Sequence, residues 1–166
     1  FKDNDLVSII TDALSANNVA AQAITFELTE SASLLDIVET NKVISELHQL
    51  GCSFAIDDFG SGFSSFAYLK ELPADYIKLD GSFIRNLHKD KVDRALVHSI
   101  IKVVKALGRQ TVAEFVENEE ILTFLEQNGV DYVQGYHLGK PLPIEAITDQ
   151  YSLVKNMTTR ITEAGK

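Results

Sequence analysis

Short runs of apolar residues alternate along this chain with longer stretches whose apolar residues recur at helical spacing. The short runs predict strands, and the longer stretches predict amphipathic helices between them. We expect strands near Ala23–Leu28, Ser53–Asp57, Tyr76–Asp80, Gln110–Val116 and Tyr132–Gln134. We expect helices near Asp5–Asn17, Ile37–Leu50, Ser65–Glu71, Lys91–Leu107 and Asn118–Gln127, and further helix from Ile144 onward.

Glycine and proline mark the ends of the predicted helices. Leu50-Gly51, Leu107-Gly108 and Asn128-Gly129 each end a helix shortly before a strand, and Leu72-Pro73 ends another. Glycine there adopts the left-handed conformation that stops a helix, and proline cannot continue one. The regular alternation of strand and helix predicts an α/β fold with a parallel sheet. No linker divides the chain, which favours one structural unit.

The composition narrows the classes of partner. The 166 residues are 45% hydrophobic, which is enough for one core, and the formal net charge is −9. This charge argues against duplex nucleic acid or an anionic membrane surface as a partner. It does not exclude a small anionic ligand, because bound metal ions can reverse the sign of the local charge. Cys52 is the only cysteine, so neither an internal disulfide nor a cysteine metal cluster is expected, and its apolar surroundings predict a buried structural thiol. We see no signal peptide and no apolar run near the ~18 residues of a membrane span.

Polar residues lie at or near the C-terminal end of every predicted strand. They are Glu27, Asp57, Asp58, Lys78, Glu114 and Gln134. In a β/α barrel or an open parallel sheet these strand ends meet at one edge, where the active site is built. The two adjacent aspartates follow a buried strand, and carboxylates in that position are usually compensated by divalent cations. Two carboxylates can hold two such ions.

Each of these residues also has a structural explanation. Glu27 could face water from an edge strand, and the aspartate pair could cap a helix and order the following glycine-rich loop. Lys78 could fill a barrel interior, and Glu114 with Glu117 could open a helix, where acidic residues favour the dipole. The occurrence of all of them at successive strand ends favours a functional site.

The same residues lie in motifs that resemble those of the EAL family of bacterial cyclic di-GMP phosphodiesterases. The resemblance runs from Phe1 to about Pro143 through five motifs: Glu27-Leu-Thr-Glu30, Asp57-Asp-Phe-Gly-Ser-Gly-Phe-Ser-Ser65, Lys78-Leu-Asp80, Ala113-Glu-Phe-Val-Glu117 and Gln134-Gly-Tyr136. It implies a partial modified TIM (β/α) barrel of about five parallel strands with intervening helices. Residues 1–143 would be the C-terminal two-thirds of the domain, and residues 144–166 a C-terminal helix and tail.

The resemblance also implies roles for individual residues. Two Mg²⁺ or Mn²⁺ ions would be held by Glu27, Asp57, Asp58 and Glu114, with Asp57 bridging. Lys78 would hold the attacking water, Glu117 and Gln134 would position water or ligands, and Glu114 would serve both catalysis and metal binding. Glu30 would anchor the Asp58–Ser65 loop.

The activity implied is two-metal hydrolysis of cyclic di-GMP to the linear dinucleotide, a step of bacterial signalling and biofilm regulation. The alternative is a catalytically degenerate module that binds cyclic di-GMP or a protein, and a third possibility is an unrelated metal hydrolase on a β/α barrel. The resemblance further implies a cytoplasmic domain, in a protein whose other domains could anchor it to a membrane. It also implies a homodimer formed through the Asp58–Ser65 loop and the Lys91–Leu107 helix.

Two departures from the family pattern bear on these expectations. The family usually has glycine where Phe115 stands. Two further metal ligands, a glutamate in a Glu-Ala-Leu motif and an asparagine in an Asn-x-Ser motif, would lie upstream of Phe1, so the chain is expected to be a piece of a longer protein. A TIM barrel needs eight strands and about 250 residues. We therefore expect two open sheet edges and little or no activity from this chain alone.

Overall fold

A sheet of five parallel strands forms the centre of the molecule, in the order β1-β2-β3-β4-β5. The computed structural model describes residues 5–35, 37–60 and 69–148. The strands are β1 Thr25–Thr29, β2 Ser53–Phe59, β3 Tyr76–Leu79, β4 Gln110–Ala113 and β5 Tyr132–Val133. Sequential parallel strands joined by helices are the repeating unit of a β/α barrel, which confirms the predicted fold class.

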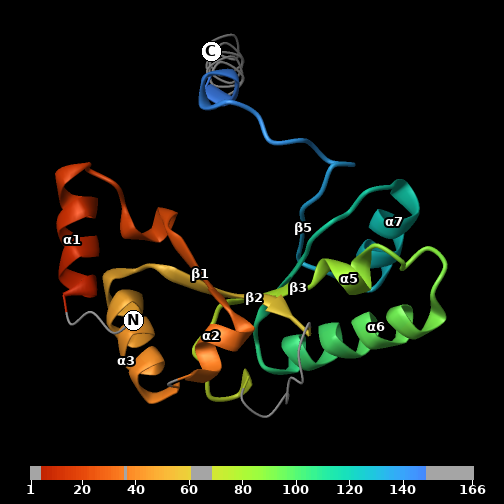
Figure 1. Ribbon diagram of the computed structural model, residues 1–166, viewed down its shortest axis with the longest axis horizontal. Coiled ribbons are helices and arrows are strands. Elements are labelled where there is room, and N and C mark those ends of the chain that lie inside the picture. The colour runs from red at the N-terminus through yellow and green to blue at the C-terminus, as the bar shows by residue number, and fades with distance from the viewer. Residues whose placement is uncertain (1–4, 36, 61–68, 149–166) are drawn as a thin grey trace, which may run out of the picture.

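The helices lie along one side of this sheet in Figure 1. They are α1 Leu6–Ala16, α2 Glu30–Leu35, α3 Ile37–Leu50, α5 Gly81–Ile84, α6 Lys91–Ala106 and α7 Glu119–Gln127, with a 3-10 turn at Ala21–Ala23. A further helical turn covers residues 144–148, in the segment that runs away from the sheet after β5. Most of the helix predicted over Ser65–Glu71 lies outside the described residues.

The C-terminal ends of two strands differ from the prediction by more than one residue. β4 ends at Ala113, and the predicted continuation to Val116 is wrong. The reason is that Phe115 adopts a φ of +55°, which an extended strand cannot contain. β2 continues to Phe59, beyond the predicted end at Asp57, because a bulge accommodates an additional residue.

The core lies between the sheet and the helices. Ile56 of β2 and Ile77 of β3 are buried in one cluster with Val104 of α6, and Phe54 of β2 is buried in a second cluster with Leu47 of α3. Cys52 is also buried, as predicted for a structural thiol. The opposite face of the sheet carries Thr25, Ala55, Tyr76, Val112 and Tyr132 around a cavity of about 350 Å³. That face corresponds to the interior of a barrel. The site described next lies at the C-terminal ends of its strands.

Two aspartates tie neighbouring strands together at their N-terminal ends. Asp75, just before β3, accepts a hydrogen bond from the backbone N–H of Phe54 in β2 (2.8 Å) and contacts His48 Nε2 (2.9 Å). Asp131, just before β5, accepts from the backbone N–H of Thr111 in β4 (2.7 Å) and from its hydroxyl (2.8 Å). The same device therefore fixes the start of two strand pairs.

Candidate functional site

A bulge near the end of β2 carries the two adjacent aspartates. β2 advances three residues, from Ile56 to Phe59, while β3 advances two, from Ile77 to Leu79. The additional residue is Asp58, whose φ of +54° is in the left-handed region, which aspartate tolerates better than most residues. The bulge returns Phe59 to the buried, helix-facing side and leaves both carboxylates at the strand end.

Lys78 lies at the centre of three carboxylates that come from β1, β2 and the segment directly after β4. Its Nζ is 2.9 Å from Glu27 Oε2, 2.9 Å from Asp57 Oδ1 and 3.0 Å from Glu114 Oε1. The residue is only 6% exposed. Burial lowers the pKa of Lys78, but hydrogen bonds to the three carboxylates outweigh this and raise the pKa above its usual value. Lys78 is therefore a fixed, charged group at the strand ends.

The aspartate pair and Glu114 form a cluster of carboxylates. Asp57, Asp58 and Glu114 each offer an oxygen atom within 4.8 Å of the others. The pKa of Asp58 is raised by burial and by the negative charges of Asp57 and Asp80, and the positive charge of Lys78 only partly offsets this. Carboxylate oxygens are the ligands that Mg²⁺ and Mn²⁺ prefer, and the excess negative charge favours a cation. The donor set therefore fits a divalent metal ion.

Glu27 fits both explanations that the sequence left open, which are an edge-strand residue that faces water and a member of the functional site. Its side chain is half-exposed, as expected for an edge strand, and its carboxylate also pairs with Lys78. It is not part of the three-residue cluster of possible ligands found among the described residues. Its neighbours Phe26 and Leu28 lie on the other face of β1, where Leu28 is buried.

Glu30 contacts the beginning of the loop that follows β2. This carboxylate is almost fully buried, and its Oε2 accepts a hydrogen bond from Gly60 N at 2.9 Å. The loop-anchoring role expected for Glu30 stays a prediction. Residues 61–65, which are most of the Asp58–Ser65 loop, lie outside the described part of the chain.

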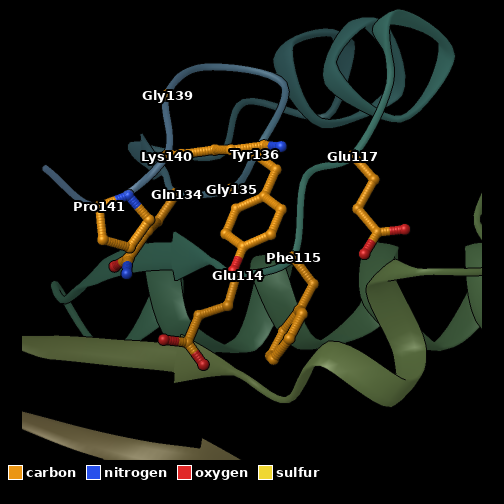
Figure 2. A pocket seen from close by; sticks show the side chains of 9 residues that line it. All are labelled: Glu114, Phe115, Glu117, Gln134, Gly135, Tyr136, Gly139, Lys140 and Pro141. Carbon is orange, nitrogen blue, oxygen red and sulfur yellow. The ribbon is translucent and has the colours of Figure 1, made fainter.

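A cavity of about 480 Å³ adjoins the carboxylate cluster, and Figure 2 shows the side chains around it. Its lining residues are Glu114, Phe115, Glu117, Gln134, Gly135, Tyr136, Gly139, Lys140 and Pro141. Two chain segments form its wall and are joined by backbone hydrogen bonds, Gln134 N to Ala113 O (2.8 Å) and Val116 N to Gln134 O (3.1 Å). A Cβ at Gly135 would lie 2.2 Å from Val116 O, so glycine is required for this close approach.

The remaining predicted residues lie on this wall. Gln134 lines both the larger cavity and the barrel-facing one, next to Lys78 and Glu27. Glu117 lies on the wall of the larger cavity, and Figure 2 shows its carboxylate apart from that of Glu114. The structure therefore groups Glu27, Asp57, Lys78 and Glu114 closely, with Glu117 at a greater separation.

Two cationic residues of this region were missed by the sequence analysis. The guanidinium carbon of Arg85 lies 4.0 Å from the centroid of the Phe115 ring, and Lys140 Nζ lies 5.5 Å from that of Tyr136. The Gln134-Gly-Tyr136 motif pointed to the right segment. No spacing signal marked Arg85 or Lys140, because they follow a four-residue helix and a loop with no periodic pattern.

Comparison with known proteins gives consistent matches. The sequence model of the EAL domain family matches residues 1–141 of this chain. A cyclic di-GMP phosphodiesterase of Shewanella oneidensis, PdeB, is 42% identical over 146 residues, which are 88% of this chain and 17% of that protein. PdeF of Escherichia coli, also a cyclic di-GMP phosphodiesterase, is 42% identical over 81% of this chain and 18% of its own length. The chain thus spans less than a fifth of these curated relatives.

A solved structure with a ligand and metal is also similar. The manganese and cyclic di-GMP complex of Klebsiella pneumoniae BlrP1 matches with a TM-score of 0.76 and 31% identity, over 81% of this chain and 34% of that one. This chain therefore contains both the motifs of the EAL family and a parallel sheet.

Proposed function

The chain belongs to the EAL domain family, and from that premise we propose that it forms the catalytic end of a phosphodiesterase that hydrolyses cyclic di-GMP to the linear dinucleotide. The observation that carries the proposal is the convergence of Glu27, Asp57 and Lys78, from three neighbouring strands, with Glu114, which directly follows β4. A merely structural lysine would need one carboxylate partner, whereas this arrangement places several acids around a single fixed ammonium.

The residues have separate tasks in this proposal. Asp57, Asp58 and Glu114 would hold the metal ions, Mg²⁺ or Mn²⁺, with Asp57 bridging two of them and Glu27 as a further ligand. The bound ions supply Lewis-acid activation of the phosphate ester and lower the pKa of water.

Lys78 acts on the nucleophile. Three carboxylates hold its ammonium and engage its three N–H donors. When one of these carboxylates binds a metal ion instead, the freed donor would hydrogen-bond to the attacking water and keep it aligned with the phosphorus. Glu117 and Gln134, which line the cavity beside Glu114, would position water and substrate.

We further propose that additional strands complete the site. Within the described residues, β1 and β5 are the two edges of the sheet, and each has one strand neighbour. Open parallel edges need to be paired or covered, and further ligands would be needed for tight binding of two ions. This chain alone is therefore expected to bind metal weakly, to show little or no activity, and to associate with other chains or be poorly soluble.

The test is hydrolysis of cyclic di-GMP by the full-length protein with Mg²⁺ or Mn²⁺, followed by chromatography of the product. Asp57→Asn should reduce turnover by about 10³-fold or more, because it removes a bridging ligand without changing the side-chain volume. Asp131→Asn is the matched control at the other end of the sheet and should leave the turnover of the folded protein unchanged. Turnover near that of the parent protein in Asp57→Asn would exclude the proposed metal role.

A binding module without catalysis is the second candidate. It is favoured by the presence of only three clustered ligand residues in the described part of the chain, which is few for two ions. Calorimetry with cyclic di-GMP separates the two functions. Saturable binding without any linear product, in the full-length protein with Mg²⁺ or Mn²⁺, would favour the binding module.

We propose that the domain forms a homodimer through α6 and the loop after β2. The apolar stripe of α6 divides into two parts: Ile100 and Val104 are buried, whereas Val92 is 66% and Leu96 43% exposed. An exposed apolar strip beside a core-facing one suits a helix that packs on both sides.

Sedimentation of the full-length protein tests the dimer. Leu96→Glu should shift the protein toward monomer, while Lys102→Glu, also exposed on α6, should leave the association unchanged. A monomer at high concentration, both with and without cyclic di-GMP, would contradict the dimer.

The location of the site is part of the same proposal. No helix within the described residues is long and apolar enough to cross a bilayer. We place the site in the cytoplasm, where nucleotide second messengers are made and degraded, and other domains of the protein could hold it at a membrane. Fractionation of cells that express the full-length protein, with protease added from outside, tests this placement.

A further inference from the structure

Phe115 is a bulky residue in a backbone conformation that normally selects glycine. Its φ is +55°, in the left-handed region, where a Cβ is unfavourable. It directly follows Glu114, which pairs with Lys78 at the carboxylate cluster. A backbone outlier next to functional side chains persists only where the surroundings hold it, and such outliers concentrate at ligand sites.

Helix α5 holds the ring of Phe115 in place. A Cβ at Gly81 would lie 2.1 Å from Phe115 Cδ2, so the ring occupies space that exists only because residue 81 is glycine. Directly after α5, the guanidinium carbon of Arg85 lies 4.0 Å from the ring centroid. Asp80 caps this helix through its bond to Ser82 N (2.7 Å), which fixes the position of Gly81. The ring is therefore oriented before any ligand binds.

This oriented ring remains partly open to solvent. Phe115 is 42% exposed, although it is a large apolar side chain in contact with a glycine and an arginine. It lines the 480 Å³ cavity together with Tyr136 and Glu114. Figure 2 shows the side chains of Glu114 and Phe115 extending in the same direction from neighbouring positions. An exposed, fixed aromatic surface thus lies beside the group that would bind metal.

We propose that Phe115 is a substrate-contacting residue whose ring packs against one purine base of the cyclic dinucleotide. The inference rests on the proposed function, because the ligand is the same molecule. A purine offers a planar π-face that stacks on aromatic side chains. Base and phosphate of one nucleotide are joined through a single ribose, so a phosphate at the carboxylate cluster brings its base within reach of the residue next to Glu114. Phe115 then sets the position of the base and contributes to specificity for a purine over a base-free phosphodiester.

Fluorescence provides a direct test, because the chain contains no tryptophan. Phe115→Trp in the full-length protein places an indole where stacking on guanine should quench its emission. Phe124→Trp is the matched control, because Phe124 in α7 also lies under an arginine, with Arg94 Cζ 5.5 Å from its ring centroid, but outside the cavity. Rapid mixing with cyclic di-GMP and Mn²⁺ should give saturable quenching in Phe115→Trp alone. Inorganic phosphate, which has no base, should give none.

Steady-state kinetics give an independent test. Phe115→Leu and Phe115→Gly should each raise KM by about 5- to 150-fold, the range expected for the loss of one base–aromatic stack, with a smaller change in kcat. Phe115→Tyr keeps the ring and should retain a KM close to that of the parent protein. Phe115→Gly also relieves the left-handed conformation, so its Tm should exceed that of Phe115→Leu. A similar rise of KM in both variants therefore excludes a folding defect as its cause.

The possible outcomes separate this inference from the proposed function. Hydrolysis by the parent protein with an unchanged KM in Phe115→Leu would overturn the role of Phe115 and leave the phosphodiesterase activity intact. Quenching without hydrolysis would support the stacking role and contradict the activity. Absence of both binding and hydrolysis in the parent protein would overturn both.

Discussion

The two ends of the sheet use the same side chains in opposite ways. At the N-terminal end, Asp75 and Asp131 each accept hydrogen bonds from a backbone N–H of the neighbouring strand. At the C-terminal end, the carboxylates of β1, β2 and the segment after β4 lie around Lys78, and two of them belong to a cluster of acids. At the N-terminal end, acidic side chains thus pair with backbone hydrogen-bond donors. At the C-terminal end, several acidic side chains lie close to one another.

The difference shows how the environment divides carboxylates between stability and function. Backbone N–H groups are neutral donors that the fold itself supplies, so each aspartate at the N-terminal end is satisfied without a ligand. At the other end, Glu27, Asp57, Asp58 and Glu114 share one ammonium, which leaves three formal negative charges at the strand ends. Such an excess is compensated by cations, and it makes this end a binding site.

The largest effect that would sharpen this comparison is expected from Lys78→Met. If Lys78 aligns the nucleophile, turnover of cyclic di-GMP should fall by about 10²- to 10³-fold or more, as when one aligned polar donor is lost at a reacting centre. Affinity for Mn²⁺ should be retained or increased, because the carboxylates lose their competing cation. Calorimetric Mn²⁺ titration measured alongside turnover checks both values. A loss of metal affinity that matches the loss of rate would contradict the assignment.

A smaller effect, of a different kind, is expected at the N-terminal end. Asp131→Ala leaves the fully buried backbone N–H of Thr111 without this acceptor, at a cost of about 1–3 kcal/mol in the free energy of unfolding. Urea denaturation followed by circular dichroism measures the change, and Asp131→Asn, which keeps an acceptor oxygen, should lose less. The kinetic constants of the folded protein should stay unchanged. If kcat fell in Asp131→Ala at a temperature where the protein is folded, the N-terminal end of the sheet would not be functionally independent of the site.

The smallest effect is expected from Asp58→Asn in the metal-free protein. Because the pKa of Asp58 is raised in the folded state, the folded protein binds this proton more strongly than the unfolded chain does. The ionised side chain therefore lowers stability above the raised pKa, and this penalty disappears as the pH falls below the ordinary pKa of aspartate. Asn also tolerates the left-handed conformation of residue 58.

The pH dependence of Tm, measured in EDTA, checks this expectation. Asp58→Asn should be slightly more stable than the parent protein at neutral pH, and the difference should vanish on acidification. With Mn²⁺ present the order should reverse, because only the parent protein gains the full binding energy of the ion. A difference in Tm that did not vary with pH would show that Asp58 is not under electrostatic strain.

The sequence predicted most of the fold because the relevant signals are local. Apolar runs and helical spacing located all five strands, and the polar residues after them located the edge that holds the site. Motif resemblance then assigned Lys78 and the acids that do lie together. Two short helices, α2 and α5, were missed because six and four residues give too little periodicity to detect.

The remaining features depend on contacts between distant residues. The bulge at Asp58 is defined by the pairing of β2 with β3, and no pattern within β2 reveals it. The early end of β4 follows from the backbone of Phe115, whose ring is held by Gly81 of α5 and by Arg85, which follows α5. Asp131 could be identified as a strand tie only once β4 and β5 were adjacent.

Strand β2 contains one residue more than its pairing with β3 requires. Without Asp58, the residues Ile56, Asp57 and Phe59 would alternate regularly opposite three consecutive positions of β3, from Ile77 to Leu79. Every helix-facing side chain of β2 would keep its place, and a single carboxylate would be lost. An in-frame deletion of one codon thus separates an ordinary barrel strand from one that presents paired acids, so gain or loss of the second aspartate within a lineage requires neither a new fold nor a new core.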